Sequence, residues 1–246
     1  MHLRIYASPL RGFMFPVAIL AGGLATRLRP ATEKIPKSLL SVAGEPFISW
    51  QLKLLKKNGI ERVVICAGYL GEQIKDFVKD GADFGLEVSY SFDGDKLLGT
   101  GGALKKALPK LGDKFFTIYG DSYLTADFKA VGDAFIKSGK NALMTVYKNN
   151  GQYDKSNVVF KNGQLIAYSK KDKLPDMNYI DYGLGCFKTK LFAEKKEEVF
   201  DMADIYSEQV ELGNVLGYEV FERFYEIGSF EGLDELGKII KVKTGK

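Results

Sequence analysis

Apolar runs and amphipathic segments alternate along the first 120 residues of the chain. Four runs have the length and the Val, Ile, Leu and Phe content of buried strands: residues 15–21, 62–68, 86–92 and 115–121. Three predicted helices lie between them: one from Pro46 that ends before Gly59, one over residues 71–81, and one over 99–108 entered through a glycine turn. In the second helix, Ile74, Phe77 and Val78 are predicted to face inward. This βαβαβ order predicts an α/β fold with a doubly wound, mostly parallel sheet flanked by helices, which binds ligands at the carboxyl ends of its strands.

The pattern changes at about residue 141. Strands are predicted over residues 141–148, 179–187, 215–221 and 224–228, with a hairpin over 157–169 that turns at Asn162-Gly163. Residues 200–213 are a predicted helix, and Ser229 is the predicted N-cap of a closing helix over 229–241. Because no linker or repeat interrupts the pattern, we predict one domain over 14–246 with two lobes, about 14–140 and about 141–246.

Composition excludes several classes of protein. The net charge of +4 comes without a Lys/Arg block, which argues against nucleic-acid binding, and no apolar run reaches the ~20 residues that span a bilayer. The single histidine, His2, lies in a predicted tail, and the two cysteines are far apart in apolar runs. The sequence therefore argues against a Ser-His-Asp or Cys-His mechanism and indicates neither a disulfide framework nor a zinc cluster. Catalysis has to rest on carboxylates, Lys and Arg, with or without a metal.

The first residues imitate a secretory signal, since Arg4 and Arg11 precede an apolar run that ends in small residues. Cleavage there would cut through the glycine-containing loop that follows the first strand. We therefore interpret residues 1–13 as a leader of uncertain structure, with Met14 as a candidate start, and we expect a cytoplasmic protein.

Residues 17–46 carry the most informative pattern. The first predicted strand is followed by Gly22 and Gly23, whose backbone N–H groups can approach an anion closely, and then by Arg27, Arg29, Lys34 and Lys37. A glycine pair alone is typical of a turn, and scattered cations are typical of a solvated surface. Their combination predicts a polyphosphate site.

This stretch resembles the N-terminal signature of the sugar-1-phosphate nucleotidyltransferases (NDP-sugar pyrophosphorylases), G-G-x-x-T-R-L-x-P-x-T-x-x-x-P-K-x-L. The matching residues are Gly22, Gly23, Thr26, Arg27, Leu28, Pro30, Thr32, Pro36, Lys37 and Leu39. The resemblance implies a Rossmann-like fold of the nucleotide-diphospho-sugar transferase type. It also implies transfer of a nucleotidyl group from an NTP to a sugar 1-phosphate, giving pyrophosphate and an NDP-sugar for cell-surface carbohydrate synthesis. The short chain is similar to the heptose-1-phosphate guanylyltransferase and N-acetylmuramate-1-phosphate uridylyltransferase type.

The resemblance assigns roles in the first lobe, which would bind the nucleotide. The segment Leu20, Ala21, Gly22 and Gly23 would contact the triphosphate, and Arg27 and Lys37 would hold phosphates as catalytic residues. Asp121, directly after a predicted buried strand, matches the metal-binding and catalytic aspartate, and is also assigned to substrate binding. Glu226 stands where relatives carry a second metal-binding Asp. The expected cofactor is Mg²⁺, which favours oxygen ligands.

A second glycine segment concerns the base. Gly99, Thr100 and Gly101 resemble the family's base-binding turn. Just upstream, Asp93 or Asp95 could accept hydrogen bonds from the two adjacent donors of guanine, which favours GTP, although the same segment is also typical of an ordinary polar turn.

The second lobe would bind the acceptor. Asp181 and Gly183 match the positions of the family's I-N-A-G segment, and Lys171 matches the lysine that holds the sugar phosphate. Lys170 stands where the family has a sugar-binding glutamate. Together with Asp181, that departure leaves open a non-sugar phosphate acceptor. Glu226 in place of an Asp leaves open a weakly catalytic regulatory subunit that binds nucleotide-sugar, although Arg27, Lys37 and Asp121 argue against it. The sequence does not identify the base or the sugar, and it does not decide whether the protein forms a homo-oligomer.

Overall fold

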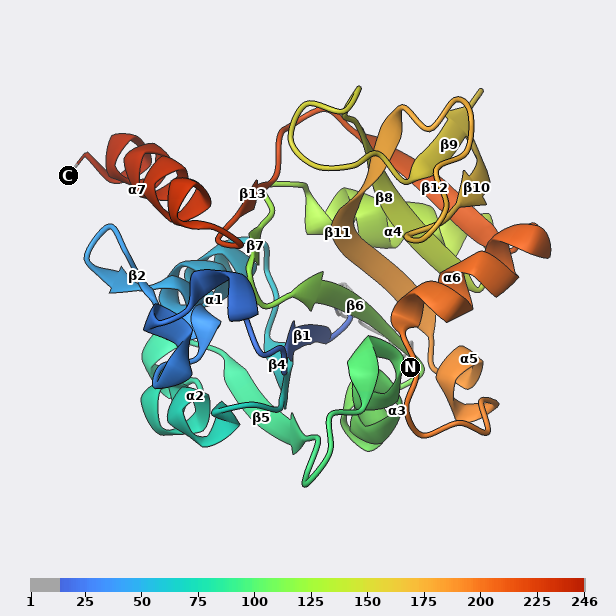
Figure 1. The fold of residues 1–246 in the computed structure, drawn as a ribbon. Helices are drawn as coiled ribbons and strands as arrows, with labels where there is room; N and C mark the ends of the chain where they lie inside the picture. Colours follow the sequence, from blue (N-terminus) through green and yellow to red (C-terminus); the bar gives the residue numbers. More distant parts are fainter. Residues whose placement is uncertain (1–13, 246) are drawn as a thin grey trace, which may run out of the picture.

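A nine-stranded mixed sheet forms the centre of the computed structural model, which describes residues 14–245 (Figure 1). The predicted leader, residues 1–13, lies outside the described residues. One apolar core on one face of the sheet includes side chains of Ile48, Ile74 and Val131, and a second core on the other face includes Leu104 and Ile205. Helices therefore cover both faces, as a doubly wound sheet requires.

The predicted parallel strands are confirmed in the first half. They are β1 (Val17–Ala21), β4 (Arg62–Ala67), β5 (Glu87–Phe92) and β6 (Lys114–Tyr119), in the spatial order β5-β4-β1-β6. The helices of this half are α1 (Phe47–Lys57), α2 (Gly71–Val78), α3 (Gly99–Leu111) and α4 (Phe128–Ser138). Short 3-10 turns occupy Thr26–Leu28, Ala31–Glu33, Lys37–Leu39 and Ala82–Phe84, and β2 (Ser41–Val42) pairs with β3 (Glu45–Pro46).

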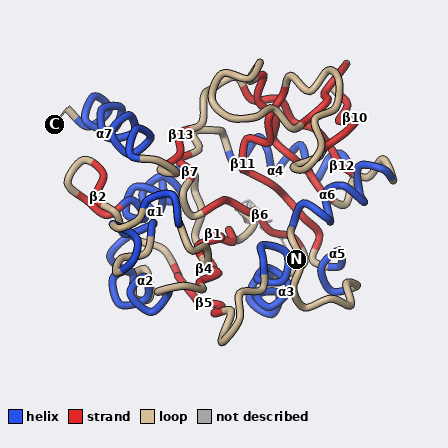
Figure 2. Tube along the Cα trace, viewed as in Figure 1, coloured by secondary structure: helices blue, strands red, loops and turns tan. Residues whose placement is uncertain are grey.

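The second half extends the same sheet. Its elements are β8 (Ala142–Lys148), β9 (Val158–Lys161), β10 (Gln164–Tyr168), β11 (Tyr179–Lys188), α5 (Lys190–Ala193), α6 (Met202–Glu211), β12 (Val215–Val220) and α7 (Phe230–Thr244). β11 lies antiparallel between β6 and β8, and β12 is parallel to β8. Long loops join β8 to β9 and β10 to β11 (Figure 2). Two short strands, β7 (Ser122–Tyr123) and β13 (Tyr225–Glu226), pair beside α1 and bring the end of the chain back to the end of β6.

Two local predictions are confirmed by backbone geometry. Asn162 and Gly163 have φ values of 52° and 75°, the left-handed conformations that a tight hairpin turn needs. The Ser229 hydroxyl accepts a hydrogen bond from the Gly232 N–H at 3.1 Å and so caps α7.

Two features differ from the sequence predictions. Phe77 on α2 does not face inward, since 40% of its surface is exposed and its ring packs beside that of Phe84. The sequence analysis also left α4 unassigned. Its signal is the N-cap Asp127, whose carboxylate accepts from the Ala130 N–H, followed by the buried Phe128 and Phe135 at helical spacing.

Candidate active site

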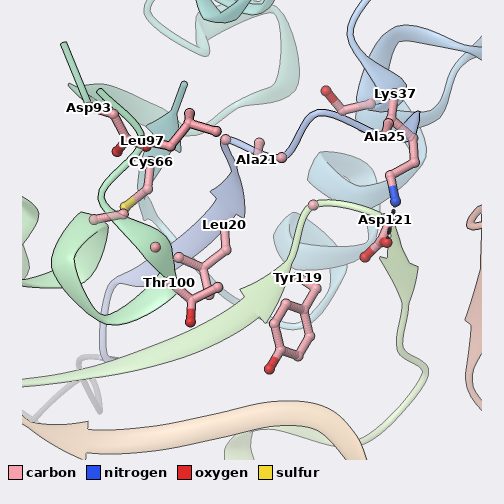
Figure 3. A pocket seen from close by; sticks show the side chains of 16 residues that line it. Leu20, Ala21, Ala25, Lys37, Cys66, Asp93, Leu97, Thr100, Tyr119 and Asp121 are labelled. Atoms are coloured by element: carbon pink, nitrogen blue, oxygen red, sulfur yellow. Dashed lines mark hydrogen bonds and ion pairs between the residues drawn. The ribbon is translucent and has the colours of Figure 1, made fainter. Parts of the chain in front are cut away.

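The turn after β1 borders a cavity of about 270 Å³ at the carboxyl ends of the parallel strands (Figure 3). Gly22 is packed so closely that a β-carbon there would lie 3.3 Å from the Gly68 nitrogen, beside the end of β4. The predicted site residues that line the cavity are Leu20, Ala21, Gly22, Gly23, Lys37, Asp93, Gly99, Thr100 and Asp121. The fold thus brings three separate sequence segments together at the carboxyl end of the sheet.

Lys37 and Asp121 form an ion pair across the mouth of this cavity. The Lys37 ammonium donates to a carboxylate oxygen of Asp121 at 2.6 Å, and both side chains are partly exposed (Figure 3). Lys37 comes from the 3-10 turn after β1, and Asp121 comes from the turn between β6 and β7. A cation and a carboxylate that face the same opening can together bind a phosphate and a metal ion.

Glu226 lies beside this pair because β13 pairs with β7. Its partner in the ladder is Ser122, and the Ile227 N–H donates to the Asp121 carbonyl at 2.9 Å. By accessible surface area Glu226 is exposed, but the protein atoms around its carboxyl group replace much of the water there. This desolvation, together with the negative charges of Asp121 and Asp154, raises the pKa of Glu226 from 4.5 to about 7.

Arg27 lies on the same side as Glu226 and does not line the cavity itself. A β-carbon on Gly228 would lie 3.5 Å from a terminal guanidinium nitrogen of Arg27. The positive charges of Lys37 and Arg27 both oppose the rise in the pKa of Glu226. Two cations and two carboxylates therefore lie close together at the open end of the site.

Asp93 and Thr100 lie at the opposite end of the cavity, where Cys66 and Leu97 also line it (Figure 3). A carboxylate oxygen of Asp93 accepts from the Leu98 N–H at 3.3 Å. Burial raises the pKa of Asp93, while this hydrogen bond and the charge of Lys106 oppose the rise.

Gly101 does not line the cavity, which differs from its predicted place in the base-binding turn. Its N–H and that of Gly102 donate to the Phe200 carbonyl at 2.9 and 3.2 Å. A β-carbon at Gly101 would lie 2.3 Å from the Phe200 ring, and one at Gly102 would lie 2.1 Å from the Glu198 carbonyl oxygen. These glycines let residues 198–201 pack directly on the start of α3.

Two of the predicted acceptor residues, Asp181 and Gly183, lie on β11, across Tyr119 from the cavity. The Asp181 carboxylate accepts from the Gly183 N–H at 3.0 Å, and Gly183 has a φ of 97°, a conformation suited to glycine. Burial raises the pKa of Asp181, and the charge of Lys170 opposes that rise.

Lys170, and not the predicted Lys171, reaches this part of the site. The Lys170 ammonium lies 3.3 Å from the Tyr119 hydroxyl and 3.4 Å from a carboxylate oxygen of Asp201. Lys171 is exposed and lines an outer cavity of about 1060 Å³ between the loops that precede β9 and β11, which Lys170 lines as well.

The family model for nucleotidyl transferases matches residues 17–240. The chain belongs to the nucleotidyl transferase family.

Two curated relatives show how far the similarity extends. The chain is 42% identical over 113 residues to an N-acetylmuramate alpha-1-phosphate uridylyltransferase of Neisseria meningitidis, a match that covers 46% of this chain and 49% of that protein. It is 30% identical over 156 residues to a D-glycero-alpha-D-manno-heptose 1-phosphate guanylyltransferase of Campylobacter jejuni, covering 63% of this chain and 67% of that protein. The chain thus spans about half the length of the first relative and two thirds of the second.

A solved structure confirms the fold. The crystal structure of a Bacillus anthracis protein assigned as a glucose-1-phosphate thymidylyltransferase, in complex with a sucrose, superposes with a TM-score of 0.81 at 24% identity. The match covers 91% of this chain and 94% of that chain. The mixed sheet with its flanking helices is therefore the nucleotide-diphospho-sugar transferase fold.

This nucleotidyl transferase offers two carboxylates for a metal ion, Asp121 and Glu226. The negative charge of Asp121 disfavours the ionised form of Glu226, a repulsion that a divalent cation would relieve. Among residues 14–245, no group of three or more His, Cys, Asp or Glu side chains is placed to hold a metal. Two carboxylates suit Mg²⁺, which keeps several waters and binds substrate phosphates as its other ligands.

Over residues 14–245, no helix is long and apolar enough to cross a membrane.

Sequence reasoning missed several residues that line the cavity. They are Ala25, Ser38, Cys66, Leu97, Ala103, Tyr119 and Gly120. Tyr119 had a usable signal, since it directly precedes Gly120-Asp121 at the end of a strand. The small apolar residues had none, because a cavity wall and a core have the same composition.

Proposed function

We propose that the protein transfers a nucleotidyl group from an NTP to a sugar 1-phosphate, releasing pyrophosphate and forming an NDP-sugar. The observation that carries this proposal is the convergence of the Gly22-Gly23 turn, the Lys37–Asp121 pair and Thr100 on one cavity. That arrangement supplies what such a transfer needs: donors for a triphosphate, a point charge, and a carboxylate for a metal. The names of both curated relatives describe reactions of this class.

The chemistry brings two polyanions together, so the site has to neutralise charge and align the reactants. In our proposal the acceptor phosphate oxygen attacks the α-phosphorus, and pyrophosphate departs in line with it. Gly22 and Gly23 offer N–H groups to the triphosphate, Arg27 binds its outer phosphates, and Lys37 moves from Asp121 to a phosphate oxygen. Asp121 and Glu226 would hold Mg²⁺, which supplies positive charge for the phosphates.

The base would lie between Asp93 and Thr100. A carboxylate accepts hydrogen bonds, and guanine presents two adjacent donors, so Asp93 favours GTP over UTP. The sugar would lie against Tyr119, where Gly183 lets a ring approach and where Lys170 and Asp181 offer polar contacts.

The test measures pyrophosphate release with Mg²⁺ for GTP, UTP, dTTP, CTP and ATP, each crossed with hexose, heptose and amino-sugar 1-phosphates. Release in one pairing supports the proposal and names both substrates. The presence of Lys170 in the acceptor region motivates adding phosphorylated amino alcohols as acceptors. If only those react, the sugar assignment is wrong. If nucleotide binds but no pair reacts, the regulatory alternative replaces the proposal.

A further inference from the structure

Gln51 is a buried polar residue on an otherwise apolar face of α1. Its side chain is 2% exposed, and its neighbours Phe47, Ile48, Leu52 and Leu55 are buried apolar residues of the same helix. Burying an amide among apolar side chains is unfavourable unless the amide is hydrogen-bonded. A glutamine at this position therefore needs a hydrogen-bond partner, and an apolar side chain could not make that hydrogen bond.

The partners are two backbone carbonyl groups on either side of Asp121. The Gln51 side-chain nitrogen, Nε2, donates to the Tyr119 carbonyl at 2.7 Å and to the Ser122 carbonyl at 2.8 Å. Because both carbonyl oxygens can only accept hydrogen bonds, the Nε2 end of the amide has to face them. The amide oxygen, Oε1, is buried and has no hydrogen-bond partner among residues 14–245, so within this part of the chain the two N–H groups account for the polar contacts of the side chain.

The turn held in this way carries Asp121, and it continues into β7, which pairs with the strand that carries Glu226. Asp121 lies between the two carbonyl groups, and its own carbonyl accepts from the Ile227 N–H, the residue after Glu226. Ser122 is also the residue that pairs with Glu226 across the β7–β13 ladder. A displacement of this turn would therefore move Asp121 and shift Glu226 relative to it.

The opposite side of the turn is already tightly packed. The Gly120 N–H donates to the Leu20 carbonyl at 2.9 Å, and a β-carbon at Gly120 would lie 2.9 Å from the Ala21 β-carbon. β1 thus restricts movement of the turn on one side, and the side-chain amide of Gln51 on α1 restricts it on the other.

We propose that Gln51 is a positioning residue that fixes the β6–β7 turn so that Asp121 and Glu226 face one divalent cation. This inference rests on the proposed function for the identity of the two ligands. Gln51 itself does not line the cavity, and it acts through the Tyr119 and Ser122 carbonyl groups.

The test replaces Gln51 by methionine, which has nearly the same shape and no N–H donor. Binding of Mn²⁺, used as a spectroscopic substitute for Mg²⁺, is measured by electron paramagnetic resonance together with kcat and KM. Groups that orient metal ligands typically change metal affinity by about 10–100-fold when they are removed. We expect Gln51→Met to weaken Mn²⁺ binding by about 10-fold or more and to lower kcat, with KM for both substrates within about twofold.

The matched control is Gln209→Met, the same substitution at a buried glutamine on α6 that is 8% exposed. It loses a buried amide but leaves the β6–β7 turn intact, so Mn²⁺ binding and kcat should stay at the wild-type values. A second variant, Gln51→Glu, keeps one donor when its buried carboxyl is protonated. Compared with wild type at the same pH, its Mn²⁺ affinity should be reduced less than that of Gln51→Met at pH 6, and this reduction should become larger toward pH 8.

The outcomes separate this inference from the proposed function. Equal Mn²⁺ affinity and kcat in Gln51→Met and Gln209→Met would overturn the positioning role, and so would a wild-type protein that binds no Mn²⁺. If the wild-type protein binds Mn²⁺ but forms no NDP-sugar, the proposed function fails while the Mn²⁺ comparison still decides the role of Gln51. Should Gln51→Met not fold, the pH dependence of Gln51→Glu decides it.

Discussion

The Lys37 ammonium lies 2.6 Å from the Asp121 carboxylate, although 84 residues separate the two in the chain. Without ligands, each therefore neutralises the charge of the other at the mouth of the cavity. In the proposed reaction, phosphates and a metal ion would offer both side chains a new partner of opposite charge. Removing one partner of an ion pair is costly because the other charge is left unpaired, and this exchange would avoid that cost.

Replacing Lys37 by methionine should remove this charge from the transition state. We expect kcat to fall by about 10²–10³-fold, the usual cost of removing one aligned donor from developing negative charge. Lys34→Met, at an exposed lysine three residues upstream, should leave kcat within about twofold. Steady-state kinetics of both variants decide the matter, and unchanged turnover in Lys37→Met would refute the mechanism.

Glu226 should make the stability of the metal-free protein depend on pH. Its pKa is raised from 4.5 to about 7, so between these values the folded protein binds more protons at this group than the unfolded chain does. The contribution of Glu226 to stability therefore decreases as the pH rises through this window. Glu226→Gln should unfold at a higher temperature than wild type at pH 8 without metal, with the two midpoints closer together at pH 5.

Adding Mg²⁺ gives the complementary result for Glu226. It should raise the unfolding midpoint of wild type at pH 8 and have a smaller effect on Glu226→Gln, because an amide is a weaker ligand for this ion. Scanning calorimetry with and without Mg²⁺ measures both effects. Equal pH dependence in the two proteins would contradict the environment described for Glu226.

The two adjacent lysines after β10 provide an internal comparison. Lys170 contacts Tyr119 and Asp201, and both Lys170 and Lys171 line the outer cavity. Loss of one hydrogen bond from a charged group costs about 1.5–3 kcal/mol, so Lys170→Ala should raise KM for the acceptor by about 10-fold or more. Lys171→Ala should change it by less than about threefold. The reverse order would restore the assignment of Lys171 that the sequence favoured.

Gly101 should tolerate no side chain. A β-carbon there would lie 2.3 Å from the Phe200 ring, which overpacks the contact between α3 and residues 198–201. We expect Gly101→Ala to lower the free energy of unfolding by about 1–3 kcal/mol and to raise KM for the NTP. Gly237→Ala is the control, because the nearest atom to its added β-carbon is 3.9 Å away and alanine favours helix, so it should be neutral or stabilising. Urea denaturation of both variants provides the comparison.

Local sequence patterns were sufficient for much of this molecule. The parallel strands followed from their apolar runs, and the Gly22-Gly23 turn and Lys37 followed from a dense motif whose residues act within one short loop. The residues whose observed positions differ from the predicted ones depend on contacts with residues that are far away in the sequence. Gly101 looked like a base-binding glycine because Phe200 is nearly 100 positions away in the chain. Lys170 and Lys171 are indistinguishable by residue type, and only the path of the loop after β10 decides which one faces Tyr119.

The contact between α3 and residues 198–201 also bears on how the protein can be assembled. The Thr100 hydroxyl accepts from the Met202 N–H at 2.8 Å, so a wall of the cavity depends on a residue 102 positions later. A chain under synthesis carries the motif of residues 17–46 long before this wall exists. A fragment that ends at residue 140 would therefore contain that motif without the finished cavity wall. On the proposed function, NTP binding should be lost in this fragment and should return when residues 141–246 are supplied as a separate polypeptide.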